Sequence, residues 1–243
     1  MTRGSVIFGY PGELGQEDYC PGVLEDIEGY RRFLTSPNGG LWSENEIQQL
    51  TNASSGDVNR AIDRLEHVDY GLVVFSGHGS FASRTNTTVL QINRTSEIDH
   101  TELLRGAQRQ TLILDCCRQP DERIVLEESI KKSAAAYVLS DASRCRVLFD
   151  ESILACAPSR VVLYSCRISQ VSIDTPAGGL YSFSLVRHAM NWAARQGQSR
   201  SVLSTVAAHN TAAITVGMRS NGTQTPVAEK PRSEPYFPFC VSA

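Results

Sequence analysis

The stretch Thr111-Leu-Ile-Leu-Asp-Cys-Cys-Arg118 predicts a short buried strand that ends in reactive side chains. Its apolar run stops at Asp115, and two cysteines follow at once. An earlier apolar run, Gly71-Leu-Val-Val-Phe75, stops in the same way at Ser76-Gly-His-Gly79. Ligands bind at the carboxyl ends of strands in an open parallel sheet, because the connecting loops gather there. The two runs therefore predict that a thiol and an imidazole meet at one edge of a sheet.

The chain around these two runs alternates between predicted strands and predicted helices. The predicted strands lie at 5–9, 46–50, 69–75, 111–114 and 160–164, and the predicted helices at 22–35, 55–65, 99–108, 180–195 and 201–216. Residues 79–98 are polar and are expected to form a loop or a hairpin. The alternation predicts an α/β domain with a mainly parallel sheet of about six strands, joined by right-handed crossovers and flanked by helices.

We expect a single domain over residues 1–243. Its larger part spans 1–118, an irregular and charged link spans 119–158, and a smaller part spans 159–243. The hydrophobic fraction of 41% and the charged fraction of 20% are ordinary for a protein with a buried core. A net charge of -3 favours neither nucleic acid nor an anionic membrane as a partner.

Cysteine usage points to a reducing compartment. The chain has seven cysteines, an odd number, and its first apolar segment is too brief for a signal peptide. No apolar run is long enough to cross a bilayer. We therefore expect a soluble cytoplasmic protein. Five of the cysteines are interpreted as reduced structural thiols: Cys20, Cys145, Cys156, Cys166 and Cys240.

His78 and Cys117 together predict a catalytic dyad. A thiol is a weak nucleophile until it loses its proton, which a nearby imidazole can accept and later return to a leaving amine. Taken singly, a buried cysteine is more simply a small apolar side chain and a histidine an ordinary loop residue. Their shared position at the ends of two predicted neighbouring strands, with Gly77 and Gly79 permitting close backbone approach, favours the dyad.

Ser76-Gly-His-Gly79 and Asp115-Cys-Cys-Arg118 resemble the paired signatures of caspase-like cysteine peptidases, especially metacaspases and their bacterial relatives. Metacaspases show Ser-Gly-His-Gly and Asp-x-Cys-His-Ser-Gly at corresponding points. Ser165-Cys-Arg-x-x-Gln-x-Ser-x-Asp174 is similar to a third metacaspase stretch, Gly-Cys-x-x-x-Gln-x-Ser-x-Asp. The resemblance extends over nearly the whole chain and implies a caspase-like α/β sandwich. One departure is Arg118-Gln-Pro120, which replaces His-Ser-Gly; caspases proper have Gln-Ala-Cys-Arg-Gly.

The resemblance assigns roles to individual residues of this chain. It implies that Cys117 is the nucleophile of a cysteine endopeptidase, that His78 is its base, and that the backbone N–H groups of Gly79 and Cys117 hold the oxyanion. It also implies that Asp26, Ser76 and Asp115 line the pocket for a basic P1 side chain, the residue before the scissile bond.

Electrostatics favours the same P1 side chain. Carboxylates suit guanidinium better than ammonium and repel a P1 aspartate, so cleavage is expected after Arg above Lys. For Asp26 a solvated helix face is the alternative interpretation.

Two other functions compete with the peptidase. A non-catalytic caspase-like scaffold or adaptor shares the fold, but the presence of both catalytic residue types favours the enzyme. The spacing Cys117-x5-Arg123 also matches a tyrosine-phosphatase loop. Asp121 and Glu122 would lie inside that loop and Pro120 removes a donor, so a dianion would be poorly bound and chance explains the spacing.

The remaining expectations concern processing, cofactors and partners. Arg144 and Arg146 lie in the predicted link and offer basic sites for activating cleavage; an ordinary charged loop explains them equally well. No histidine has zinc-ligand spacing with a cysteine, so we expect no metal or other cofactor; the resemblance leaves calcium dependence open. The partners implied are protein or peptide substrates and an upstream activating peptidase. Bacterial relatives suggest a role in regulated cell death or antiphage defence.

Overall fold

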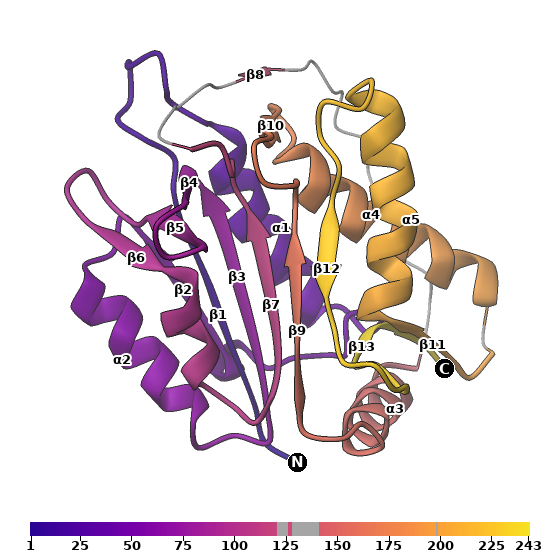
Figure 1. Ribbon diagram of the computed structural model, residues 1–243. Helices are drawn as coiled ribbons and strands as arrows, with labels where there is room; N and C mark the ends of the chain where they lie inside the picture. Colours follow the sequence, from indigo (N-terminus) through magenta and orange to yellow (C-terminus); the bar gives the residue numbers. More distant parts are fainter. Residues whose placement is uncertain (121–125, 128–140, 198) are drawn as a thin grey trace.

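A central sheet organises the computed structural model, which describes residues 1–120, 126–127, 141–197 and 199–243 (Figure 1). Six strands make up this sheet in the described part of the chain, in the order β12 (Val227–Glu229), β9 (Ser159–Tyr164), β7 (Arg109–Asp115), β3 (Tyr70–Gly77), β1 (Arg3–Tyr10) and β2 (Ile47–Thr51). All neighbours pair in parallel except β12, which runs antiparallel to β9. The predicted α/β fold with a mainly parallel sheet is confirmed.

Helices cover both faces of the sheet (Figure 1). The first face carries α1 (Gly22–Thr35), α3 (Ala142–Leu154), α4 (Leu180–Gln196) and α5 (Thr205–Arg219), and the second carries α2 (Ser55–Leu65) and the 3-10 helix η2 (His100–Arg105). Side chains alternate between the faces along each strand, so Leu72 and Val74 join the first core and Val73 and Phe75 join the second. Because both faces are buried, the central strands are continuous apolar runs.

Shorter elements complete the fold around the central sheet. They are the antiparallel trio β4 (Gly79–Ala82), β5 (Thr87–Gln91) and β6 (Glu97–Asp99), the antiparallel pair β11 (Ser201–Ser204) and β13 (Pro238–Ser242), the parallel pair β8 (Leu126–Glu127) and β10 (Ile173–Asp174), and the 3-10 helix η1 (Glu44–Glu46). The expected loop or hairpin after Gly79 is therefore a small sheet.

Part of the expected irregular link is helical. Asp141 caps α3 by accepting hydrogen bonds from the backbone of Ser143 and Arg144, and the helix buries Cys145 and Phe149 against the first core. The expected helix at 201–216 begins later, because 201–204 pair with β13 as β11 before α5 starts. Within the described residues, no helix combines the length and apolar character that crossing a membrane requires.

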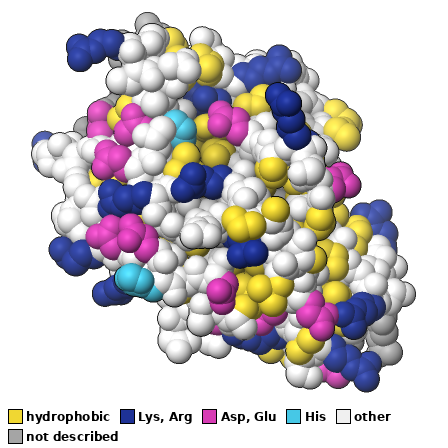
Figure 2. All heavy atoms as spheres, turned by 60° about the horizontal axis from the view of Figure 1, so that its bottom comes forward, with side chains coloured by type: hydrophobic (Ala, Val, Ile, Leu, Met, Phe, Trp, Pro, Cys, Tyr) yellow, Lys and Arg dark blue, Asp and Glu magenta, His cyan; other side chains and the backbone are white. Residues whose placement is uncertain are grey.

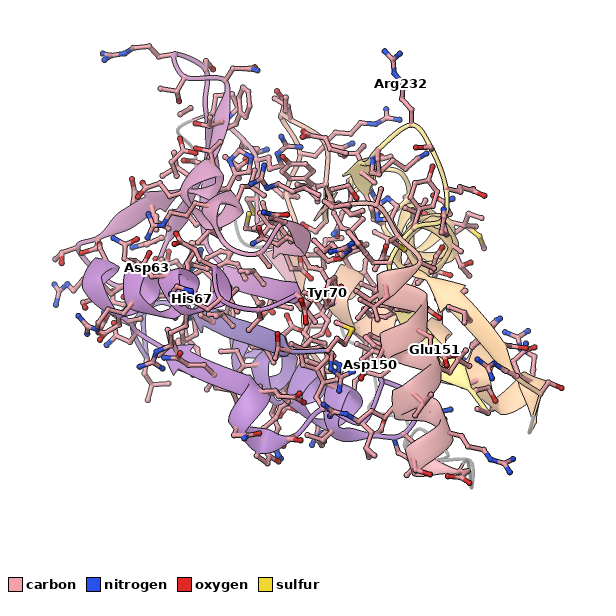
Figure 3. All side chains as sticks on the ribbon, turned by 90° about the horizontal axis from the view of Figure 1, so that it is seen from below. Asp63, His67, Tyr70, Asp150, Glu151 and Arg232 are labelled. Carbon is pink, nitrogen blue, oxygen red and sulfur yellow. The ribbon has the colours of Figure 1, made fainter. Side chains whose placement is uncertain are left out.

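Ion pairs of Arg3 connect the amino-terminal end of the sheet to Glu46 and to Asp150 of α3. Arg3 on β1 lies 3.1 Å from Asp150 of α3. Figure 3 looks at this end of the sheet and labels Asp150 and also Tyr70, the first residue of β3. The guanidinium of Arg3 also stacks 4.5 Å from the ring of Trp42. Figure 2 turns this end of the molecule forward and shows side chains of both charge signs interspersed over it. The opposite, carboxyl-terminal end of the sheet carries the predicted site.

Candidate active site

His78 and Cys117 line one pocket at the carboxyl ends of β3 and β7. The two strands are neighbours, and their register places Ser76 opposite Asp115. Gly77 has a φ of +147°, which L side chains rarely adopt, and this glycine turns the chain between β3 and the imidazole. His78 is buried and Cys117 is half-buried. The sheet register thus delivers to one pocket the two residues that the strand ends predicted.

Gly79 allows the loop after His78 to close onto the loop that carries Cys117. A Cβ atom at position 79 would lie 2.8 Å from Sγ of Cys116 and 3.1 Å from the carbonyl oxygen of Cys117. These spacings are below van der Waals contact, so any larger residue would push the two loops apart. The role of the Gly79 and Cys117 backbone N–H groups as oxyanion donors stays a prediction, and this close approach is the geometry it requires.

Ser172 contacts the Cys117 thiol. Its backbone N–H donates to Sγ of Cys117 at 3.3 Å, and Sγ lies 3.8 Å from the Ser172 carbonyl oxygen. Burial raises the pKa of the Cys117 thiol, the hydrogen bond from Ser172 lowers it, and the charge of Asp115 raises it. The net shift is upward, so the thiol needs a base to become a nucleophile.

A second thiol faces the same imidazole. Sγ of Cys20, in the loop before α1, lies 3.9 Å from Nε2 of His78, and Cys20 lines the same pocket as Cys117. The interpretation of Cys20 as a reduced structural thiol is compatible with its burial, but the sequence did not predict its position beside His78. Nothing local in the sequence indicates its position, because 58 residues separate it from His78 and only the parallel pairing of β1 with β3 brings the two loops together.

Asp26 faces the interior beside Ser76 and is only 4% exposed, so the alternative of a solvated helix face is excluded. Its carboxylate accepts a hydrogen bond from Oγ of Ser76 at 2.6 Å and from the backbone N–H of Gly179 at 3.0 Å. Burial and the neighbouring charge of Asp115 raise the pKa of Asp26 well above its ordinary value. Two of the three residues predicted for the P1 pocket, Asp26 and Ser76, are therefore in direct contact.

The third predicted pocket residue, Asp115, lies in the same cluster. It accepts from Oγ of Ser172 at 2.5 Å and from the backbone N–H of Ser182 at 2.9 Å. Asp174 adds a further carboxylate to the pocket and accepts from the N–H of Gly22 at 3.2 Å. We did not predict Ser172 or Asp174 as site residues, although both stand in the third motif quoted above, which was the available signal.

The amino terminus of α4 stabilises this group of acids. Gly179 is the N-cap of the helix, and its N–H and that of Ser182 point to Asp26 and Asp115. Free N–H groups and the helix dipole both favour negative charge there. A Cβ atom on Gly179 would lie 2.5 Å from Oδ2 of Asp115 and 3.1 Å from Oδ2 of Asp26, so both carboxylates lean over a residue without a side chain. We call the part of the site formed by Asp26, Asp115 and Asp174 the acidic recess. The site therefore combines a thiol, an imidazole and this acidic recess.

The family comparison agrees with this geometry. A family model described as the caspase domain matches residues 8–236. The chain belongs to the caspase domain family. Members of this family are cysteine peptidases, which is consistent with a thiol and an imidazole in one pocket. No curated protein sequence matches the chain at a significant level.

Solved structures share the fold at low sequence identity. Caspase-1 from Spodoptera frugiperda is similar with a TM-score of 0.58 and 12% identity, over 93% of this chain and 87% of that one. The Drosophila initiator caspase Dronc gives 0.56 and 11%, over 94% and 79%. A protein from Geobacter sulfurreducens gives 0.59 and 16%, over 99% and 100%. These similarities confirm the caspase-like fold.

Arg118 of this caspase domain turns away from the pocket. Its guanidinium lies 3.9 Å from the ring centre of Tyr164, and Nε donates to Oγ1 of Thr88 at 2.9 Å. The side chain is buried on the second face of the sheet, so it supplies no positive charge to the acidic recess.

The other predicted site residues lie elsewhere. Arg144 and Arg146 are on α3 rather than in an irregular link; Arg144 is exposed, whereas Arg146 pairs with Glu46 at 2.6 Å. Their role in processing stays a prediction. Arg123, which completes the phosphatase-like spacing, lies outside the described residues. Among the described residues, no three His, Cys, Asp or Glu side chains are grouped so as to hold a metal ion.

Proposed function

We propose that this caspase domain is an endopeptidase that cleaves protein substrates after basic P1 residues, with Arg above Lys. The observation that carries the proposal is the shared pocket: Asp115 and Asp174 line it together with Cys117 and His78. Caspase-domain membership supports the reaction class. The acidic recess beside the thiol supports the P1 preference. A role in bacterial cell death or defence rests on the resemblance alone.

In the proposed mechanism, His78 takes the proton of the Cys117 thiol as the thiolate attacks the scissile carbonyl carbon. The carbonyl electrons move to oxygen, and the N–H groups of Gly79 and Cys117 stabilise the resulting oxyanion. The oxyanion collapses to an acyl-enzyme when His78 returns the proton to the leaving amine. Water, deprotonated by His78, then hydrolyses the thioester and regenerates the thiol. Because the pKa of Cys117 is raised, the base is essential at neutral pH.

The charges of the recess set the P1 preference. A guanidinium is planar, offers five N–H donors and is weakly hydrated, so it suits carboxylates at several angles better than the point charge of Lys. Asp115 and Asp174 provide acceptors of this kind on the pocket wall, and Asp26 contacts Ser76 of that wall. A P1 aspartate would bring another carboxylate into a largely buried recess and is expected to be refused. The turn of Arg118 away from the pocket leaves no cation there among the described residues.

A panel of fluorogenic peptides that differ only at P1, together with mass-spectrometric mapping of cleaved proteins, tests the proposal. We expect cleavage after Arg and Lys, none after Asp, and loss of activity in Cys117→Ala. His78→Ala should lower kcat/KM by at least ~10²-fold, the usual scale for a positioned general base. Preferred cleavage after Asp would contradict the P1 assignment and leave the dyad intact. A scaffold without catalysis would show no labelling of Cys117 by an electrophilic peptide that ends in Arg.

Activation by cleavage at Arg144 or Arg146 is a further part of the proposal. Both residues are helical, so α3 has to open locally before the chain can enter a peptidase cleft. The exposure of Arg144 favours that site over Arg146, whose pairing with Glu46 resists opening. Gel analysis of the purified protein before and after activation checks this. Full activity of an intact chain with both residues changed to Gln would rule it out.

A further inference from the structure

Gln224 is a fully buried side chain in the loop between α5 and β12. Its Nε2 donates to the carbonyl oxygen of Ser165 at 3.0 Å and to Oγ of Ser172 at 3.1 Å. Its Oε1 accepts from the backbone N–H of Ile173 at 3.0 Å. One amide thus uses both donors and its acceptor to hold the segment that runs from the end of β9 to β10.

The segment held by Gln224 is the one that contacts the nucleophile. The Ser172 N–H donates to Sγ of Cys117 at 3.3 Å, and the Ser172 hydroxyl donates to Asp115 at 2.5 Å. The hydroxyl has one proton, which it gives to Asp115, so it accepts from Gln224 with a lone pair. Ser172 donates both of these hydrogen bonds. If Ser172 shifts, the Cys117 thiol and the Asp115 carboxylate therefore each lose a donor.

We propose that Gln224 is a positioning residue for catalysis, which fixes Ser172 so that its N–H faces Cys117 and its hydroxyl faces Asp115. The inference rests on the proposed function, because it takes Cys117 as the nucleophile. Gln224 is itself held in place: Oγ of Ser220 accepts from its backbone N–H and donates to its carbonyl oxygen, both at 3.1 Å. The end of α5 is thereby linked to the active-site wall.

The electrostatic effect of this linkage has a definite sign. A donor aimed at sulfur stabilises the thiolate, and a donor aimed at Asp115 reduces the charge that opposes the thiolate. Both effects lower the pKa of Cys117, so loss of the Gln224 amide should raise it. The titratable groups that line the pocket with Cys117 or act on its charge are Cys20, His78, Asp115, Cys116, Cys166 and Asp174. Gln224→Met changes none of them directly.

The test follows the pH dependence of Cys117 alkylation by iodoacetamide, read by mass spectrometry on the whole chain. Gln224→Met keeps the length of the side chain and removes its three hydrogen bonds. We expect the alkylation midpoint to rise by about one pKa unit, the scale of one lost hydrogen bond to a charged group. We also expect kcat for an Arg peptide to fall by about tenfold with a smaller change in KM. Gln224→Asn, which keeps the amide but shortens its reach, should shift the midpoint in the same direction and serves if the Met variant does not fold.

Gln110 supplies the matched control. It is also fully buried, near the start of β7 and thus at the end of the strand opposite the site, and its Nε2 donates to the carbonyl oxygen of Leu103 at 2.7 Å. Gln110→Met removes a buried amide and its hydrogen bond to Leu103 without touching Ser172. A merely structural role for Gln224 predicts equal alkylation midpoints in Gln110→Met and Gln224→Met.

The outcomes separate this inference from the proposed function. A raised midpoint in Gln224→Met, with an unchanged midpoint in Gln110→Met, supports the positioning role even if no peptide is cleaved. An unchanged midpoint in a folded Gln224 variant, or equal shifts in both Met variants, overturns it. Absence of peptide cleavage by the wild-type chain counts against the proposed function and leaves the alkylation result to decide the role of Gln224.

Discussion

Sγ of Cys20 lies 3.9 Å from Nε2 of His78, so two cysteines, Cys20 and Cys117, face the pocket that holds one imidazole. Of these two, Cys117 is the one that follows β7 beside Gly79, whose N–H is a proposed oxyanion donor, and the one that accepts the Ser172 N–H. A nucleophile has to lie next to the oxyanion donors, because attack creates the charge that they stabilise. The geometry therefore favours Cys117 as the nucleophile.

The first prediction separates the two thiols. Cys117→Ala should lower kcat/KM for an Arg peptide by at least ~10³-fold. Cys20→Ala should keep it within about tenfold, which corresponds to ~1.4 kcal/mol of transition-state stabilisation. The measurement is steady-state cleavage, with mass spectrometry to identify the cysteine labelled by an electrophilic Arg peptide. The assignment would be contradicted if Cys20→Ala were inactive and the electrophilic peptide labelled Cys20 in the wild-type chain.

Cys116→Ala provides the control for this pair. Cys116 is buried in the second core, so its truncation should cost about 1 kcal/mol of unfolding free energy while most activity remains. If Cys116→Ala were the inactive variant, the nucleophile would be one residue earlier in the motif.

The second prediction concerns Gly179, over which the acidic recess closes. An alanine methyl group would lie 2.5 Å from Oδ2 of Asp115, so the carboxylate has to move. Displacement of a binding group by about 1 Å costs ~10²-fold in rate, and we expect kcat/KM of Gly179→Ala for Arg peptides to fall by that amount. Gly217→Ala is the matched control, since nothing lies within 4 Å of its added Cβ in α5. That change should preserve activity and stabilise the helix. Equal kcat/KM in the two variants would show that the recess tolerates the methyl group.

The third prediction is that Asp26→Asn stabilises the protein while it weakens cleavage. Burial raises the pKa of Asp26, so the folded state holds its proton at pH values where the unfolded chain has released it. The wild-type chain therefore loses stability as pH rises from the unfolded pKa, about 4, through the folded pKa. Asn does not titrate. The Asp26→Asn variant should therefore equal the wild type in stability below about pH 4 and show its full gain in stability above the folded pKa of Asp26.

The stability difference is measurable by thermal unfolding. A rise of about 2–4 °C at neutral pH corresponds to ~1 kcal/mol for a chain of this size. The amide also places N–H donors where the carboxyl group has acceptors for guanidinium, which should lower kcat/KM for Arg peptides by at least ~30-fold, or ~2 kcal/mol. An Asp26→Asn variant that is less stable than wild type at pH 7 and equal to it at pH 4 would reverse the sign of this argument.

Some of this site could be predicted from sequence because the signal is local. The apolar runs of β3 and β7 end abruptly, and parallel strands place their ends at one edge, so His78 and Cys117 follow from pattern alone. Asp26 had an available signal too: it shares a helical face with Val23 and Tyr30, which are both buried. The alternative of a solvated face rests on the charge of Asp26 and not on its position in the helix.

Other features depend on contacts between distant parts of the chain. Gln224 and Ser172 are 52 residues apart and meet only because α5 and β12 return the chain to the end of β9. Asp174 was quoted in a motif, but nothing in the motif shows that Gly22 donates to it across 152 residues. α3 had a local signal, a cap at Asp141 and apolar residues at helical spacing, which the charged residues among them obscured.

The last prediction links substrate charge to the reactivity of the nucleophile. The charge of Asp115 is one of the causes that raise the pKa of Cys117, so a cation in the acidic recess should lower it. Methylguanidinium carries that charge and lacks a peptide group, which keeps the thiol accessible. At pH 7 it should accelerate alkylation of Cys117 by iodoacetamide roughly twofold, because more thiolate forms, although the thiolate becomes a slightly weaker nucleophile. N-methylurea, a neutral analogue of similar shape, should have no effect. Asp115→Asn should raise the basal alkylation rate and abolish the stimulation. Equal rates with methylguanidinium and N-methylurea in the wild-type chain would show that the recess and the thiol are electrostatically independent.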